Sequence, residues 1–213
     1  GTAIEIPGLT DYGITKSSWG DKEITDADGD TVTALTWGLV VTYPADADPG
    51  DLVYVDLIAD AVTEDGSAIP ESHYTTPEAL GTDGIIVVPL VGNEWGEPLM
   101  AGTDYTVYVL LKEDQPSWVT PENFGEADMT ALQGLEWLTY YEVESMVKNG
   151  TISETTPISM LAVELTPSGF AKLAGSPLVV QYSTVLDTGK IPDGAAVLAH
   201  NLARIPTNWT YAS

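Results

Sequence analysis

Apolar and polar residues alternate along several short runs of the chain, separated by Gly, Pro and Asp. The clearest run is DTVTALTWGLVVTYP (30–44), in which every second residue from Leu35 through Trp37, Leu39 and Val41 to Tyr43 is apolar. A period of two residues is typical of a β-strand with one buried face. Repeated runs of this kind predict an antiparallel β-sandwich.

Further strands are predicted by Val-, Ile- and Tyr-rich runs. We expect DLVYVDLIAD (51–60) to pair with the strand at 30–44 through the turn ADADPG. The other predicted strands are at 11–22, 84–90, 104–112, 158–166, 176–186, 195–205 and 208–213.

Two segments have helical rather than strand spacing. Residues 126–150 carry Met129, Leu132, Leu135, Leu138 and Val143 near a helical period, and Asn149-Gly150 is a plausible helix end. A shorter helical turn is predicted at 166–175, capped by Ser168 and ended by Gly175. Without a repeat or a clear linker, we predict a single domain over 1–213, with a lead at 1–12 and a helical insertion at about 114–150.

Composition narrows the classes of partner. The 213 residues include 32 acidic and seven basic side chains, which give a net charge of −25. Such a surface repels phosphate backbones and anionic lipids, so we expect no nucleic-acid or membrane partner. There is no cysteine, which excludes disulfides and thiolate chemistry.

Several motifs, read in order, resemble one family. These are GDTVTALTWGLVVTYPADADPGDLVYVDLIAD, then LMAGTDYTVYV, then LAVELTPSGFAKLAGSPLVVQYSTVL, then NLARI and NWTYAS. In this order they resemble the fimbrial isopeptide-forming (CnaA-like) domain of Gram-positive pilins and cell-wall-anchored surface adhesins. The resemblance runs from about Lys16 to the C-terminus and implies an all-β, Ig-like sandwich. Asp187-Thr188 stands where members often have a longer loop, and the last asparagine-to-tyrosine spacing is longer than usual.

The resemblance also implies a chemistry. In the family, a lysine of the first strand and an asparagine of the last join through their side chains and release ammonia, assisted by an acidic residue. It assigns Lys16 as nucleophile, Asn201 as electrophile and Asp56 as the assisting acid. Glu164 is the alternative acid and Asn208 the alternative asparagine.

Elementary chemistry supports these residue types. A solvated lysine with a pKa near 10.4 is almost fully charged at neutral pH and is then no nucleophile. Burial disfavours both the ammonium and the carboxylate, so a neutral pair becomes accessible. Lys16 is in phase with Ile14, Asp56 with Tyr54 and Ile58, and Asn201 with Ala203. The competing interpretations are a surface lysine on an edge strand and a carboxylate at a turn or strand end.

Two other groups are weaker candidates. Asp26, Asp28 and Asp30 alternate as in calcium loops, but the glycine and the closing glutamate of such a loop are misplaced, which favours a solvated turn. The aromatic residues of the insertion are either a small core that anchors it or an exposed ligand-binding cluster. The candidate ligand-binding residues are Trp118, Trp137, Tyr140 and Tyr141.

We therefore predict a structural or adhesive domain of a bacterial surface protein or pilus subunit, located outside the cell in the cell wall or a pilus. It is expected to need no cofactor, to be no turnover enzyme, and to contact other pilus or surface-protein domains. The alternative is an adhesin module whose insertion binds host glycan or extracellular-matrix protein. An extracellular enzyme is a third alternative, which the sequence disfavours because no motif in it resembles a paired-carboxylate active site.

Overall fold

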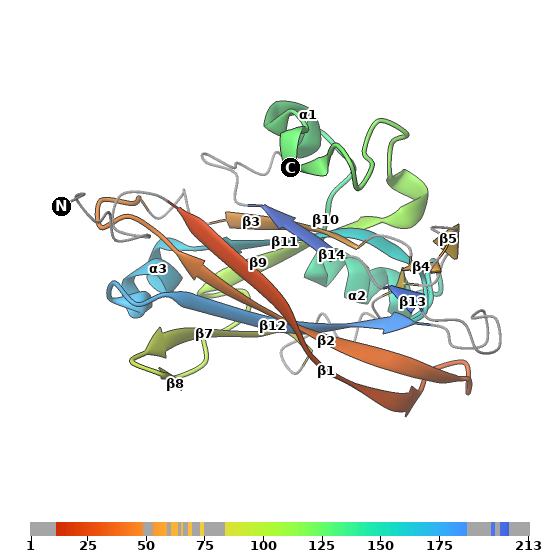
Figure 1. Cartoon of the computed structure of the whole chain (residues 1–213), viewed down its shortest axis with the longest axis horizontal. Helices are drawn as coiled ribbons and strands as arrows, with labels where there is room; N and C mark the ends of the chain where they lie inside the picture. The colour runs from red at the N-terminus through yellow and green to blue at the C-terminus, as the bar shows by residue number, and fades with distance from the viewer. Residues whose placement is uncertain are drawn as a thin grey trace.

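The computed structural model describes residues 12–48, 53–58, 61–63, 65, 68–69, 73–74, 84–186, 197–198 and 201–204. Two antiparallel sheets stacked face to face form the body of the fold (Figure 1). The predicted all-β sandwich is thus confirmed at the level of its layers. The predicted strand at 208–213 lies outside the described residues.

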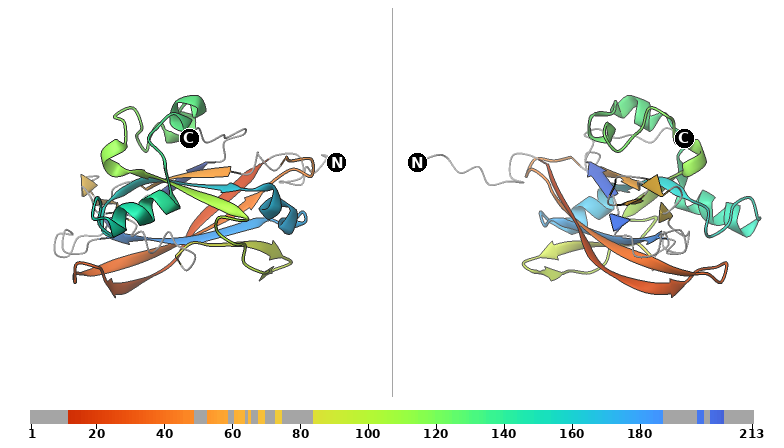
Figure 2. Two further views of the ribbon diagram at one scale, coloured as in Figure 1. Left: turned by 180° about the vertical axis from the view of Figure 1, so that it is seen from behind. Right: turned by 45° about the vertical axis from the view of Figure 1, so that its right-hand side comes forward.

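The first sheet follows the order β1-β2-β12-β7-β8, and β6 also pairs with β12. Its strands are β1 (Gly13–Thr25), β2 (Thr31–Thr42), β12 (Leu178–Leu186), β7 (Ile86–Val91), β8 (Glu94–Trp95) and β6 (His73–Tyr74). The long β1–β2 hairpin leaves β1 at one edge of this sheet (Figure 2).

The second sheet follows the order β10-β9-β11-β3-β14. Its strands are β10 (Leu138–Thr139), β9 (Tyr105–Leu111), β11 (Ile158–Leu165), β3 (Val53–Ile58) and β14 (Asn201–Arg204). A small third sheet joins β13 (Val197–Leu198), β4 (Ala61–Thr63) and β5 (Ala68–Ile69). The expected pairing of 51–60 with 30–44 is wrong, because β3 pairs with β11 and β14 in the other sheet.

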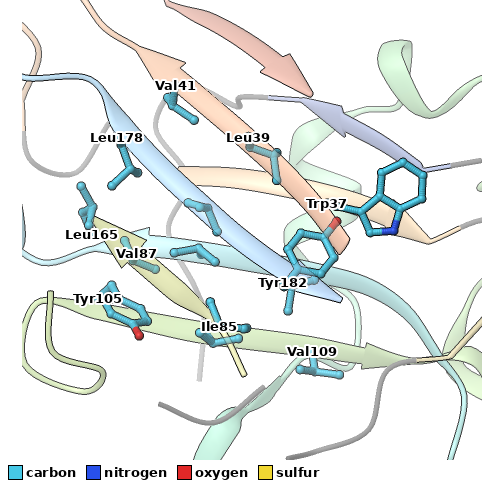
Figure 3. Close-up of a cluster of buried hydrophobic side chains, with 14 of the residues drawn as sticks. Trp37, Leu39, Val41, Ile85, Val87, Tyr105, Val109, Leu165, Leu178 and Tyr182 are labelled. Atoms are coloured by element: carbon cyan, nitrogen blue, oxygen red, sulfur yellow. The ribbon is translucent and has the colours of Figure 1, made fainter. Parts of the chain in front are cut away.

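The main core fills the space between the sheets. Trp37, Leu39 and Val41 on β2 are buried there, as their alternation predicts, and Leu35 and Tyr43 pack against them. Figure 3 shows this cluster, including the rings of Trp37 and Tyr182. The face of β3 that carries Asp56 and Ile58 points into the same layer, since Ile58 belongs to this cluster.

A second core covers the outer face of the second sheet. Here the segment between β9 and β11 folds back with the 3-10 turns η3 (Lys112–Asp114) and η4 (Phe124–Glu126) and the helices α1 (Met129–Gln133) and α2 (Tyr140–Lys148). Phe124, Leu132 and Trp137 bury their side chains against Leu57 and Met160 of the sheet. The helices predicted within 114–150 are therefore present, and this segment shields that face of the sheet.

The insertion is not one continuous helix. Gly134 caps α1, and Leu138–Thr139 pair with β9 before α2 begins. Thr139 and Glu142 form a capping box that starts α2, and Gly150, with φ of 80°, follows its end as expected. None of the described helices is long and apolar enough to cross a membrane.

The third helix, α3 (Pro167–Leu173), occupies the predicted position but has a different cap. Thr166 Oγ1 accepts from the backbone N–H of Gly169, whereas the Ser168 hydroxyl donates to Asp104. Pro167 fits the first turn because its missing N–H needs no partner there. The chain leaves the helix through Ala174 and Gly175, both with positive φ.

Candidate functional site

A buried lysine–aspartate pair lies between the two sheets. Lys16 sits on β1 opposite Leu39, and Asp56 lies in the middle of β3 in the facing sheet. The Lys16 Nζ donates to both carboxylate oxygens of Asp56 at 2.6 Å. The Lys16 side chain is 10% exposed and that of Asp56 is 0% exposed. Neither residue is the surface group that its charge alone would suggest.

Aromatic rings complete the surroundings of this pair. The next inward-facing row of the first sheet places Trp37 on β2 opposite Tyr182 on β12. Lys16 Nζ lies 5.3 Å from the Trp37 ring centroid and 5.4 Å from that of Tyr182. The Tyr182 hydroxyl accepts from Lys16 Nζ at 2.8 Å and donates to Asp56 Oδ2. Trp37 is held in place by its Nε1–H, which donates to Thr184.

Burial moves the two pKa values toward each other. Desolvation lowers the pKa of Lys16 from 10.5 to about 8, although the neighbouring Asp56 carboxylate opposes the shift. Desolvation likewise raises the pKa of Asp56 from 3.8 to about 7 against the opposing effect of Lys16. Transfer of a proton from the ammonium to the carboxylate is strongly unfavourable in water, and here it becomes close to balanced. The site can therefore populate a neutral amine beside a neutral carboxylic acid.

The last described strand brings Asn201 to the same region. The register of β14 on β3 sets Asn201 opposite Ile58 and Ala203 opposite Asp56. Paired and alternate positions share a face in antiparallel strands, so the position of Asn201 belongs to the Asp56 face. The edge strands β1 and β14 also contact each other. Lys16, Asp56 and Asn201, which are far apart in the sequence, are thus brought to one corner of the sandwich.

The two alternative residues have different outcomes. Glu164 on β11 pairs with Val53 of β3 and Thr106 of β9. Its neighbours along the strand, Val163 and Leu165, face the main core. Its carboxylate is therefore on the opposite face of the sheet from Lys16, although burial raises its pKa as well. Asn208 lies outside the described residues.

The acidic candidates for a metal site form a hairpin loop. Asp26 Oδ1 accepts from the backbone N–H groups of Asp28 and Asp30, and Asp28 accepts from Thr155. This loop joins β1 to β2. Across the part of the chain that the structure describes, no group of three or more His, Cys, Asp or Glu side chains is placed to hold a metal ion.

The four aromatic candidates for ligand binding do not form one surface. Trp137 is 4% exposed and donates to the backbone oxygen of Leu132, so it is part of the anchoring core. Trp118 and Tyr141 are exposed. The ring centroids of Tyr140 and Tyr141 are 5.6 Å apart, and both residues line a small hollow that also includes Gly102. The interpretation as an anchoring core is therefore correct for Trp137 and Phe124.

A different aromatic pair is exposed on the first sheet. Trp19 follows Ser18 at a bulge in β1, and its ring lies against Gly38 of β2. Its ring centroid is 6.1 Å from that of Trp95 on β8. The sequence gives little sign of this contact, because the two residues lie in strands that are not neighbours in the sheet.

Comparison with known proteins adds no identification: no protein-family model matches the chain, and no curated protein is significantly similar to it.

Proposed function

We propose that the chain is a structural or adhesive domain of a bacterial surface protein or pilus subunit, of the Ig-like isopeptide-forming type. Its stiffness comes from a covalent bond between the side chains of Lys16 and Asn201. The observation that carries the proposal is the buried contact of Lys16 Nζ with Asp56 at 2.6 Å, beside the β14 position of Asn201. The order of the sequence motifs gives independent support.

The arrangement suits one self-modification rather than repeated turnover. A neutral Lys16 amine attacks the side-chain carbonyl carbon of Asn201, and the Asp56 carboxyl group donates a hydrogen bond to the developing oxyanion. The new C–N bond replaces the bond to the amide nitrogen, which leaves as ammonia. Folding holds the groups together and thereby takes the place of a high reactant concentration.

A buried ion pair is otherwise a poor device for stability. Desolvation of both charges can exceed their attraction, and apolar residues of similar volume often stabilise a fold equally well or better. Bond formation turns the Lys16 amine into an uncharged amide with Asn201 and leaves Asp56 as a neutral acid, which removes that penalty. This favours a reactive role for Lys16 and Asp56 over a purely structural one.

Intact mass spectrometry of the purified protein tests the proposal. We expect a mass lower than that of the sequence by one ammonia, and a cross-linked proteolytic peptide that contains Lys16 and Asn201. The Lys16→Ala and Asn201→Ala variants are expected to show their full calculated masses. A wild-type mass with no ammonia missing would overturn the proposal, and a peptide that contains Asn208 would reassign the asparagine.

A further inference from the structure

Tyr182 occupies a position in the candidate site that its sequence pattern does not reveal. On β12 it alternates with Leu178 and Val180 and is 1% exposed, so it looks like an ordinary core aromatic. Its ring indeed packs in the main core. Its hydroxyl, however, reaches the Lys16–Asp56 pair between the two sheets.

The hydroxyl bridges the two reacting groups. A tyrosine has one O–H donor and acceptor lone pairs. Here the donor is directed to Asp56 Oδ2, while the oxygen accepts from Lys16 Nζ at 2.8 Å. A continuous hydrogen-bonded path therefore runs from the lysine nitrogen through the phenol to the carboxylate. A phenylalanine would fill the same space without that path.

We propose that Tyr182 is a catalytic residue of the bond-forming reaction, which orients the Lys16 amine and relays a proton from its nitrogen to Asp56. The inference rests on the proposed function and adds a third participant to it. Hydrogen bonds from the neutral amine to Tyr182 and Asp56 use its two N–H groups and leave its lone pair for the carbonyl carbon.

The relay balances each step. Lys16 Nζ bonds to the Asn201 carbonyl carbon while Asp56 passes its proton to the carbonyl oxygen, which leaves a positively charged nitrogen and a carboxylate. That nitrogen then gives a proton to Tyr182 Oη as Tyr182 gives its own proton to Asp56 Oδ2. Finally Asp56 protonates the departing amide nitrogen and recovers a proton from the hydroxyl on the carbon. The products are one amide bond, one ammonia, and Tyr182 and Asp56 in their starting forms.

The test compares the rate of ammonia loss in wild type and Tyr182→Phe. Each chain is made by cell-free synthesis, stopped at intervals and measured by intact mass spectrometry. We expect Tyr182→Phe to form the bond roughly 10- to 100-fold more slowly, at or somewhat below the usual range for one positioned acid–base group. The wild-type rate is expected to fall in D₂O. Tyr182→Phe is expected to show a smaller solvent isotope effect, because the transfer through the hydroxyl is lost while the transfers by Asp56 remain.

Tyr105→Phe is the matched control. Tyr105 is 2% exposed and belongs to the same core, but it lies on β9 and has no described contact with Lys16 or Asp56. We expect this variant to retain the wild-type rate and isotope effect. A role of Tyr182 in packing alone would predict the same for Tyr182→Phe, because both substitutions keep the ring.

A second measurement does not depend on bond formation. In Asn201→Ala, where Lys16 and Asp56 remain unbonded, NMR follows the titration of the Asp56 carboxyl carbon. Since a donated hydrogen bond favours the carboxylate, adding Tyr182→Phe should raise the pKa of Asp56 further.

The outcomes separate the two proposals. If wild type loses no ammonia, both the proposed function and the relay are wrong. If wild type loses ammonia and Tyr182→Phe does so with an unchanged rate and isotope effect, only the relay is wrong. An unchanged Asp56 titration would also contradict the described bridge.

Discussion

At the scale of single residues, the unusual feature is the cause of the pKa shifts of Lys16 and Asp56. Burial shifts each pKa more than the charge of the other residue does. For both groups desolvation is the largest influence on the pKa, and the attraction between the charges only opposes it. A surface ion pair would show the reverse balance, because water screens its charges without a desolvation penalty. The pair is thus prepared to exchange a proton rather than to hold two full charges.

This predicts a characteristic pH dependence of stability in the unbonded form, Asn201→Ala. Asp56 has a pKa of about 7 in the folded chain against 3.8 ordinarily, so the folded form binds more protons between these values. Its contribution to the free energy of unfolding therefore falls as the pH rises from about 4 to about 7. Lys16 has a pKa of about 8 against 10.5, so the unfolded chain binds more protons there and stability rises again above pH 8.

Denaturant unfolding of Asn201→Ala between pH 4 and pH 10 measures this profile. The control carries Lys16→Met and Asp56→Asn as well, which removes both titrating groups and leaves the other acidic residues in place. We expect the free energy of unfolding of Asn201→Ala, taken relative to that of the control, to be lowest at about pH 7–8. A difference that does not vary with pH would show that the two pKa values are not shifted by folding.

At the scale of secondary-structure elements, the local pattern predicts the strands better than their partners. The faces of β2 follow from alternation, because one side must be buried. The assignment of β3 to β2 fails because pairing is a long-range choice: β3 crosses to the other sheet and pairs with β11 and β14. Alternation along a single strand fixes its faces but does not reveal which strand lies beside it.

The same distinction applies to the site. The alternation of strand faces and the family resemblance predict that Lys16 and Asp56 belong to the site, and the contact between them is observed. Tyr182 is missed because an aromatic residue in an apolar strand is ordinarily core, and only the assembled sheets bring its hydroxyl to the pair. The cap of α3 is misassigned for a related reason, since Ser168 and Thr166 are both good caps and Asp104, in the turn before β9, accepts from the Ser168 hydroxyl.

The link between α3 and β9 gives a prediction at this scale. A Cβ added at Gly169 would lie 1.9 Å from the backbone oxygen of Asp104, so Gly169→Ala must push the helix away from the turn that precedes β9. Asp104 is fully buried there and also accepts from Lys172 and Met100. We expect Gly169→Ala to lower the free energy of unfolding by about 1–3 kcal/mol, as overpacked sites do.

Gly125→Ala serves as the matched glycine control, because nothing lies within 4 Å of its added Cβ. Denaturant unfolding in the Asn201→Ala background compares both variants without a covalent bond. The described helix–strand contact would be wrong if Gly169→Ala were as stable as Gly125→Ala.

At the scale of the whole molecule, the proposed bond would join the two sheets at one corner. β1 and β14 are edge strands of different sheets and contact each other, so a bond between them acts across the sandwich rather than along one sheet. It would also close a loop of 185 positions between Lys16 and Asn201. By the loop-entropy argument used for disulfides, such a closure stabilises the folded chain by about 5 kcal/mol.

Pulling on the two ends of the chain tests this role directly. In wild type the force passes through the Lys16–Asn201 bond, so the sandwich between these residues is shielded and does not extend. In Asn201→Ala the strands carry the load and separate, which releases roughly 600–670 Å of additional chain at about 3.3–3.6 Å per residue. Single-molecule force spectroscopy measures that length, and Asn201→Ala retains the buried Lys16–Asp56 pair, so the comparison isolates the covalent bond. A full-length extension step in wild type molecules that have lost ammonia would mean that the bond closes a smaller loop, and therefore that a different lysine or asparagine forms it.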